Sequence, residues 1–267
     1  MQNEKVIEHI VHWLKVYIEK SGMNGFVIGV SGGIDSAVTS TLAAKTGFPT
    51  LVVEIPIHQH TDQVSRAKEH INWLKQNFTN VKDERVELTE TFDAFSKAVS
   101  ADKSQISTEL SLANSRSRLR MATLYYYAGK DRLLVVGTGN KVEDFGVGFF
   151  TKYGDGGVDI SPIADLLKSE VYKIAKGLHI LESIQKATPT DGLWTDNRSD
   201  EDQIGATYNE LEWAMQVYKS SKPHDFEGRK REVLEIFLRL NSAMQHKINP
   251  IPVCEIPEEL KKANFVH

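Results

Sequence analysis

The chain has 267 residues, 40% hydrophobic and 25% charged, a composition that excludes a disordered or fibrous protein. The net charge of -4 argues against nucleic-acid binding, which relies on an excess of Lys and Arg on one face. The only cysteine, Cys254, excludes an intrachain disulfide and favours a reducing compartment, so we expect a cytoplasmic protein. No segment approaches the roughly 18 consecutive apolar residues of a membrane helix, so we expect no membrane partner. The length fits one α/β core, which predicts a single domain over residues 1–267.

The first half of the chain alternates helical patterns with short apolar runs. Apolar residues at helical spacing predict a first helix over residues 4–20. Apolar runs predict strands at 26–30, 51–55 and 133–136 with a weaker one at 86–88, and helices at 36–45, 62–77 and 106–129. Unalternating apolar strands separated by helices indicate an α/β fold with an open, mostly parallel sheet and helices on both faces.

The second half is less regular. Residues 146–159 contain five glycines and residues 189–205 are polar and rich in Asp, so we expect two long loops. Two further helices are predicted over 206–219 and 226–246, followed by a tail that contains prolines. Long loops in compact domains are usually functional or disordered, which makes both loops candidates for lids over a site.

A glycine-rich turn, Ser31-Gly32-Gly33-Ile34-Asp35-Ser36, joins the first predicted strand to its helix. Backbone N–H groups and the positive end of the helix dipole converge there, so we expect an anion such as phosphate. Asp35 is out of place in a simple anion site, and a Mg²⁺ ion between its carboxylate and the phosphates explains its presence. The turn contains neither a Walker A loop nor a Rossmann fingerprint. The alternative is a strand-to-helix turn that binds nothing.

This turn resembles the pyrophosphate loop of the ATP pyrophosphatases, which split ATP into AMP and pyrophosphate. The resemblance implies the adenine-nucleotide alpha-hydrolase-like fold of that superfamily. It also implies that the loop contacts ATP through Gly29, Val30, Ser31, Gly32, Gly33, Ile34, Asp35 and Ser36. The loop identifies the bond that is cleaved, but not the acceptor.

Two downstream segments identify the closer family. Gly137-Thr138-Gly139-Asn140 follows the last predicted strand, and residues 148–159 read GFFTKYGDGGVD. Both are similar to the signature of the NAD synthetases. The resemblance implies that Thr138 contacts ATP, that Glu143 binds Mg²⁺ together with Asp35, and that Lys152 and Asp159 contact deamido-NAD. The chain carries one residue more than that family between Glu143 and Lys152, which leaves Asp144 as an alternative metal ligand.

The remaining motifs fit the same family. Lys168, at the start of a predicted helix, and Thr190 match further ATP contacts, while Arg118, in NSRSRLRM at 114–121, and the pair His246-Lys247 match contacts to deamido-NAD. Where the family often continues with arginine, this chain has Ile248. The segment from Asp200 to Tyr208 also matches a family motif, and we interpret Asp200, Glu201 and Tyr208 as structural.

The resemblance implies an ammonia-dependent ligase that adenylates the carboxylate of deamido-NAD and releases AMP when ammonia attacks, with ATP as co-substrate and Mg²⁺ as cofactor. Asp35 and Lys168 would then stabilise the departing pyrophosphate, and Asp159 is the candidate for accepting a proton from ammonium. The family forms homodimers in which Arg118 would serve the site of the neighbouring subunit. Two alternatives remain: a tRNA-modifying or GMP-forming pyrophosphatase, and a nucleotide-sensing module that binds ATP without turnover.

Overall fold

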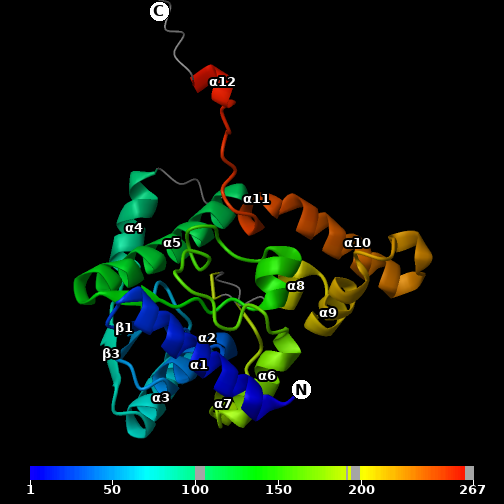
Figure 1. The fold of residues 1–267 in the computed structure, drawn as a ribbon. Coiled ribbons are helices and arrows are strands. Elements are labelled where there is room, and N and C mark those ends of the chain that lie inside the picture. Colours follow the sequence, from blue (N-terminus) through cyan, green and yellow to red (C-terminus); the bar gives the residue numbers. More distant parts are fainter. Residues whose placement is uncertain (100–105, 191, 194–198, 262–267) are drawn as a thin grey trace, which may run out of the picture.

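The computed structural model describes residues 1–99, 106–190, 192–193 and 199–261, and its centre is a four-stranded sheet (Figure 1). The strands are β1 (Gly25–Gly29), β2 (Thr50–Glu54), β3 (Val81–Arg85) and β4 (Leu133–Val135), in the order β3-β2-β1-β4. All three neighbouring pairs are parallel, which confirms the predicted open parallel sheet. The sequence runs outward from β1 to β3 and returns to β4 on the other side of β1.

Helices cover both faces of this sheet, as predicted. Because side chains alternate along a strand, Phe26 and Ile28 of β1 face one side and Val27 the other. Phe26 and Ile28 belong to a core shared with α1 (Asn3–Ser21), α2 (Ile34–Lys45) and α6 (Lys168–Gly177). Val27 packs with residues of α5 (Ile106–Asp131). On the side of α2, α3 (Thr61–Asn77) packs over β2 and β3.

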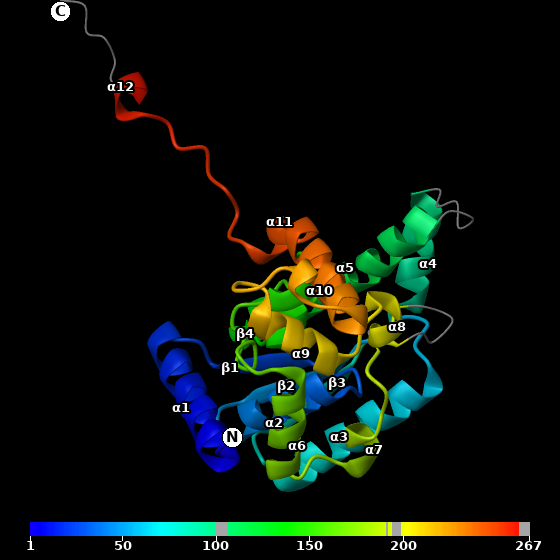
Figure 2. The same cartoon turned by 90° about the vertical axis from the view of Figure 1, so that its right-hand side faces the viewer.

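A second apolar cluster lies beyond the sheet, on the right of Figure 1. It joins α8 (Asp200–Ile204), α9 (Tyr208–Val217) and α10 (Gly228–Ala243) to a π-helix, η1 (Val142–Val147). The other short elements are α4 (Thr89–Ala98), α7 (Glu182–Gln185), a 3₁₀ turn η2 (Pro223–Asp225), α11 (Gln245–Ile248) and α12 (Glu258–Lys261). The segment from α11 to α12 leads away from the body in both views (Figure 2). The single-domain organisation of residues 1–267 stays a prediction.

Two expectations about the elements were wrong. The weak strand predicted at 86–88 lies at 81–85, because β3 is an edge strand in which only Val81 is buried and the polar side chains are exposed. The loop predicted at 189–205 contains the short helix α8, and its residues 191 and 194–198 lie outside the described residues. Among the described residues, no helix has the length and apolar character needed to cross a membrane.

Candidate active site

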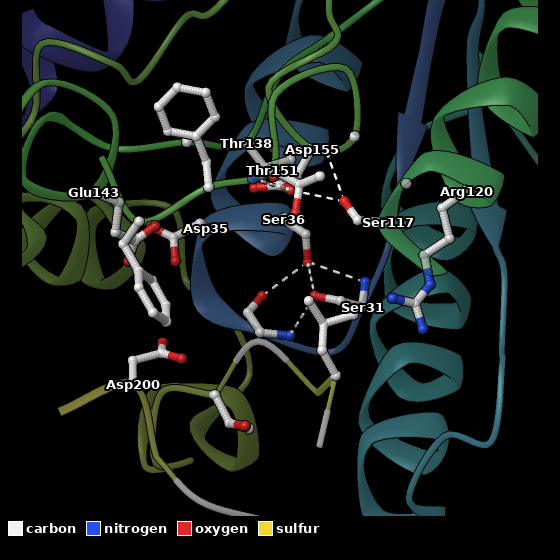
Figure 3. Close-up of a pocket in the computed structure, with 18 of the residues that line it drawn as sticks. Ser31, Asp35, Ser36, Ser117, Arg120, Thr138, Glu143, Thr151, Asp155 and Asp200 are labelled. Carbon is white, nitrogen blue, oxygen red and sulfur yellow. Dashed lines mark hydrogen bonds between the residues drawn. The ribbon is translucent and has the colours of Figure 1, made fainter. Parts of the chain in front are cut away.

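A cavity of about 850 Å³ opens at the carboxyl ends of β1, β2 and β4 (Figure 3). It lies where the strand order reverses, between β1 and β4, which is where open α/β sheets bind ligands. All the residues predicted to contact ATP line it, namely Gly29, Val30, Ser31, Gly32, Gly33, Ile34, Asp35, Ser36, Thr138, Lys168 and Thr190. The fold therefore gathers residues as far apart in sequence as Gly29 and Thr190 around one space.

The glycine-rich turn is held by its own hydroxyl groups. Ser36 Oγ donates to Gly33 O at 3.0 Å and lies 3.2 Å from Ser31 Oγ. Gly32 has φ +82°, and a Cβ atom there would lie 2.5 Å from Gln63 O of α3, so only glycine fits. Because α2 begins at Ile34, its first N–H groups have no partner within the helix and are available to an anion.

Three charged side chains meet beside this turn. Lys168 Nζ lies 2.6 Å from Asp35 Oδ2 and 2.9 Å from Glu143 Oε1, and the Lys168 side chain is only 4% exposed. Burial alone would lower the pKa of Lys168, but the two carboxylates outweigh it and raise that pKa above its usual value. Burial raises the pKa of Glu143, yet Lys168 and the hydrogen bond from Tyr208 leave it below the ordinary value. Burial raises the pKa of Asp35 in spite of Lys168.

Two neutral side chains hold the carboxylates in place. Asn140, which is fully buried, donates from Nδ2 to Asp35 Oδ1 at 3.2 Å, and its Oδ1 accepts from the backbone N–H groups of Val142 and Glu143. The hydroxyl of Tyr208 donates to Glu143 Oε1 at 2.5 Å and to Asp200 Oδ2 at 3.1 Å. We interpreted Tyr208 and Asp200 as structural from the sequence, but both lie at the charged centre.

The donor set of this centre fits a Mg²⁺ ion. Within the described residues, no group of three or more His, Cys, Asp or Glu side chains is placed to hold a metal. Asp35 and Glu143 nevertheless supply two carboxylates that already share one cation. Mg²⁺ is usually bound in proteins by one or two carboxylates, with water and substrate phosphates completing its six ligands. A phosphate group at the neighbouring glycine-rich turn, where we predict an anion, would bring such oxygens.

The π-helix η1 (Val142–Val147) contains both Glu143 and Asp144, the two candidate metal ligands. A π-helix has one residue more per hydrogen-bonded turn than an α-helix, so the additional residue predicted between Glu143 and Lys152 could be accommodated there. Glu143 points to Lys168, whereas the Asp144 carboxylate lies against Gly139, where a Cβ atom would be 2.1 Å from Asp144 Oδ2. Burial and the charges of Glu143, Asp155 and Asp35 raise the pKa of Asp144 to about 8. Of the two candidate metal ligands, Glu143 is therefore the one whose carboxylate shares the Lys168 ammonium with Asp35.

The residues predicted to contact deamido-NAD line another part of the same cavity, with one exception. Lys247 Nζ donates to Phe150 O at 2.6 Å and to Gly148 O, and Lys152 Nζ donates to His246 O, so α11 is tied to residues 148–152. Ile248, where the resemblance often implies an arginine, lies beside Gly148. Arg118 is exposed, and its Nε donates to Lys152 O of its own chain at 3.3 Å.

The exception is Asp159, which is not part of the cavity wall. Its Oδ2 accepts from Val135 N at 2.8 Å and its Oδ1 from the hydroxyl of Tyr125 at 2.9 Å. Asp155, four residues earlier, does line the cavity. Burial raises the pKa of Asp155, although hydrogen bonds from Ser117 and Thr151 act in the opposite direction. Asp155 stands in the same glycine-rich signature as Asp159, but no local feature of the sequence distinguishes it as a site residue.

Comparisons with a family model, with curated proteins and with solved structures all point to one family. Residues 6–250 match the family model described as NAD synthase. An NH(3)-dependent NAD(+) synthetase of Mesoplasma florum is 39% identical over 79% of this chain and 84% of that protein. One of Alkaliphilus metalliredigens is 38% identical over 92% of this chain and 97% of that protein. The solved structure of an NMN synthetase from Francisella tularensis is 30% identical, with a TM-score of 0.84, covering 96% of this chain and all of that one.

Proposed function

The chain belongs to the NAD synthase family and is a ligase that forms a carbon–nitrogen bond, and we propose how the residues of its cavity carry out that reaction. The reaction is the ATP-dependent amidation of deamido-NAD by ammonia, which gives NAD, AMP and pyrophosphate. The observation that carries the proposal is the meeting of Asp35, Glu143 and Lys168 beside the phosphate-binding turn, in one cavity with the residues expected to contact the acceptor.

The first step is activation of the acceptor. A carboxylate resists attack by ammonia because its charge repels the nucleophile and oxide is a poor leaving group. When the nicotinate carboxylate attacks the α-phosphorus of ATP, negative charge grows on the departing pyrophosphate. The N–H groups of the glycine-rich turn and the Lys168 ammonium, which line the same cavity, would stabilise that charge. Mg²⁺ held by Asp35 and Glu143 would add electrostatic stabilisation of the same oxygens.

The second step is attack of ammonia on the acyl-adenylate, with loss of AMP. Ammonium must first lose a proton. Asp159 was our candidate for that proton, but hydrogen bonds within the chain occupy both its oxygens, whereas Asp155 lines the cavity and has a raised pKa. A raised pKa brings a carboxylate closer to the value useful for proton transfer near neutral pH. We therefore favour Asp155 as the proton acceptor, and a contact of Asp159 with deamido-NAD would require one of its oxygens to leave Val135 N or the Tyr125 hydroxyl.

The assembly and location are further parts of this proposal. We propose a homodimer, because α5 carries the exposed residues Leu110 and Tyr126 and the resemblance places Arg118 of that helix at a neighbouring site. We also propose a cytoplasmic location, consistent with a single cysteine and no disulfide.

A second candidate acceptor is the carboxylate precursor of NMN, because one similar solved structure is an NMN synthetase. That acceptor carries the same nicotinate carboxylate but lacks the adenylate half of deamido-NAD. Both acceptors would be offered to the purified chain with ATP and Mg²⁺, with and without ammonium, and the amide, AMP and pyrophosphate would be measured. We expect the larger kcat/KM with deamido-NAD. A larger value with the mononucleotide would favour the second acceptor, and no amide from either would refute the amidation.

A further inference from the structure

Lys168 lies between two carboxylates contributed by distant parts of the chain. Asp35 belongs to the first turn of α2, Glu143 to η1, and Lys168 is the first residue of α6. The ammonium lies over the ring of Tyr208, with Nζ 4.7 Å from the ring centre, so an aromatic face closes one side of it. Lys168 is thus enclosed by protein and does not lie in solvent.

A metal ion that lies between Asp35 and Glu143 and this ammonium would need the same two oxygens. Both contacts of Lys168 are to Asp35 Oδ2 and Glu143 Oε1, at 2.6 and 2.9 Å. Mg²⁺ binds carboxylate oxygens at about 2.0–2.1 Å, so an ion coordinated by these two oxygens would occupy the space of Nζ. The two cations would also repel each other strongly in a site shielded from water. Either the ammonium or the metal ion can therefore lie between Asp35 and Glu143.

The other oxygen of Asp35 offers no easy alternative. Asp35 Oδ1 accepts the hydrogen bond from Asn140, which is anchored in turn to the backbone of η1. The hydroxyl of Tyr208 donates a hydrogen bond to Glu143 Oε1 and keeps that oxygen on the side of Lys168. The carboxylates are thus fixed in place, whereas the long side chain of Lys168 can change its position by bond rotation.

We propose that Lys168 takes the place of the metal ion in the nucleotide-free protein, and that the carboxylates become available only when the triphosphate draws the ammonium toward its own oxygens. When Lys168 leaves the two carboxylates, it loses their negative charge. A triphosphate bound at the glycine-rich turn, in the same cavity, supplies negative charge in their place. In the nucleotide-free protein, a free divalent ion has no room between Asp35 Oδ2 and Glu143 Oε1. This inference rests on the proposed function for the identity of the metal ligands and for binding of the triphosphate at the glycine-rich turn.

The test measures binding of Mn²⁺, which shares the preference of Mg²⁺ for oxygen ligands, to the protein without nucleotide. Free Mn²⁺ would be followed by electron paramagnetic resonance, with calorimetry as a second measurement. The wild-type chain should show no binding that depends on Glu143, judged against Glu143→Gln. Lys168→Met should gain one site, at least about tenfold tighter than any wild-type binding, because two facing carboxylates lose their cation. Asp35→Asn added to Lys168→Met should abolish that site.

The matched control is Lys141→Met, which removes the same charge from an exposed pair with Asp165 and should gain no Mn²⁺ site. Binding of Mn²⁺ by the nucleotide-free wild type that is lost in Glu143→Gln would overturn the proposal, even if Lys168→Met does not fold. A folded Lys168→Met that gains no site would overturn it as well. Because neither acceptor nor ammonia is present, absence of amidation would leave this result unaffected.

Discussion

The hydroxyl of Tyr208 donates a hydrogen bond to Glu143 Oε1 at 2.5 Å, across 65 residues of sequence. The same hydroxyl reaches Asp200, the first residue of α8, at 3.1 Å. Burial and the charges of Glu143 and Asp200 raise the pKa of Tyr208, so the hydroxyl remains protonated and can only donate to a carboxylate. Tyr208 therefore links the helix that follows residues 189–199 to the carboxylate proposed to bind the metal.

We expect Tyr208→Phe to lower amidation by about 10- to 100-fold, the range seen when a group that orients a metal ligand is removed. The loss should be partly restored by high Mg²⁺, because the ring is kept and only the orientation of Glu143 is weakened. Tyr218→Phe, in the neighbouring apolar cluster, is the control and should keep its activity. Equal losses at every Mg²⁺ concentration would argue against an effect through Glu143.

Replacement of Asp35 should separate turnover from stability. Asp35→Asn keeps the size of the side chain but removes charge from the metal and Lys168, so we expect a loss of roughly 10²–10³ in kcat. The melting temperature should fall less than the turnover, because Glu143 still pairs with the buried Lys168 ammonium and no apolar packing is removed. Asp165→Asn, which changes an exposed partner of Lys141, serves as the control.

The products of the wild-type reaction should be AMP and pyrophosphate, and detection of ADP with orthophosphate would contradict the proposed cleavage.

The parts of this structure that could be predicted from the sequence are those with a local signal. Apolar runs located β1, β2 and β4 because these strands are buried. They did not locate β3, whose sequence VKDER is polar because it forms the exposed edge of the sheet. The π-helix could not be predicted either, since residues 142–147 have no periodicity that distinguishes it from a loop.

In the candidate site too, local sequence predicts some residues, whereas others can be identified only from the fold. The glycine-rich turn predicts an anion site from local sequence alone, because its glycines, serines and helix start lie within six residues. The roles of Asn140 and Tyr208 depend on contacts with Asp35 and Glu143, residues 105 and 65 positions away, which no local pattern encodes. Asp155 and Asp159 stand in one signature, and only the fold separates the aspartate that lines the cavity from the one that bonds to β4.

His70 should make stability depend on pH. It is fully buried between α3 and α2, with Nε2 2.9 Å from Ser40 Oγ, and burial lowers its pKa from 6.5 to about 4. Since the unfolded chain binds the proton more readily, the stabilisation is complete above about pH 6.5 and is lost as the pH falls toward 4. At about 1.4 kcal/mol per pH unit, this lowering corresponds to about 3 kcal/mol.

Denaturant unfolding at pH 7 and pH 4.5 would test this expectation. His70→Gln has no group that titrates in this range, so it should lose less unfolding free energy on acidification than the wild type does. His12→Gln, which replaces an exposed histidine of α1, should follow the wild-type curve. If His70→Gln shows the wild-type slope, His70 does not contribute to the acid sensitivity.

Asp155 and Asp159 should respond differently to the same substitution. In Asp159→Asn the amide can no longer accept from both Val135 N and Tyr125, so we expect a loss of about 1–3 kcal/mol in unfolding free energy. Asp155→Asn should instead lower kcat, and its effect should shrink as the pH rises, because free ammonia becomes more abundant. The two variants would be compared by melting temperature and by pH–rate profiles. A rate loss in Asp155→Asn that is independent of pH would count against its role as proton acceptor.

The last prediction concerns the subunit to which Arg118 contributes. If a twofold dimer forms and Arg118 serves the neighbouring site, Arg118→Ala and Asp35→Ala should each be nearly inactive alone. A heterodimer of the two places both lesions in one site and leaves the other intact. Random exchange of equal amounts should therefore restore about a quarter of wild-type activity. The contact of Arg118 with Lys152 O in its own chain raises the opposite possibility, in which each heterodimer site carries one lesion and no activity returns. Measuring the mass of the exchanged dimers together with their activity distinguishes these outcomes, because verified exchange without recovery assigns Arg118 to its own subunit.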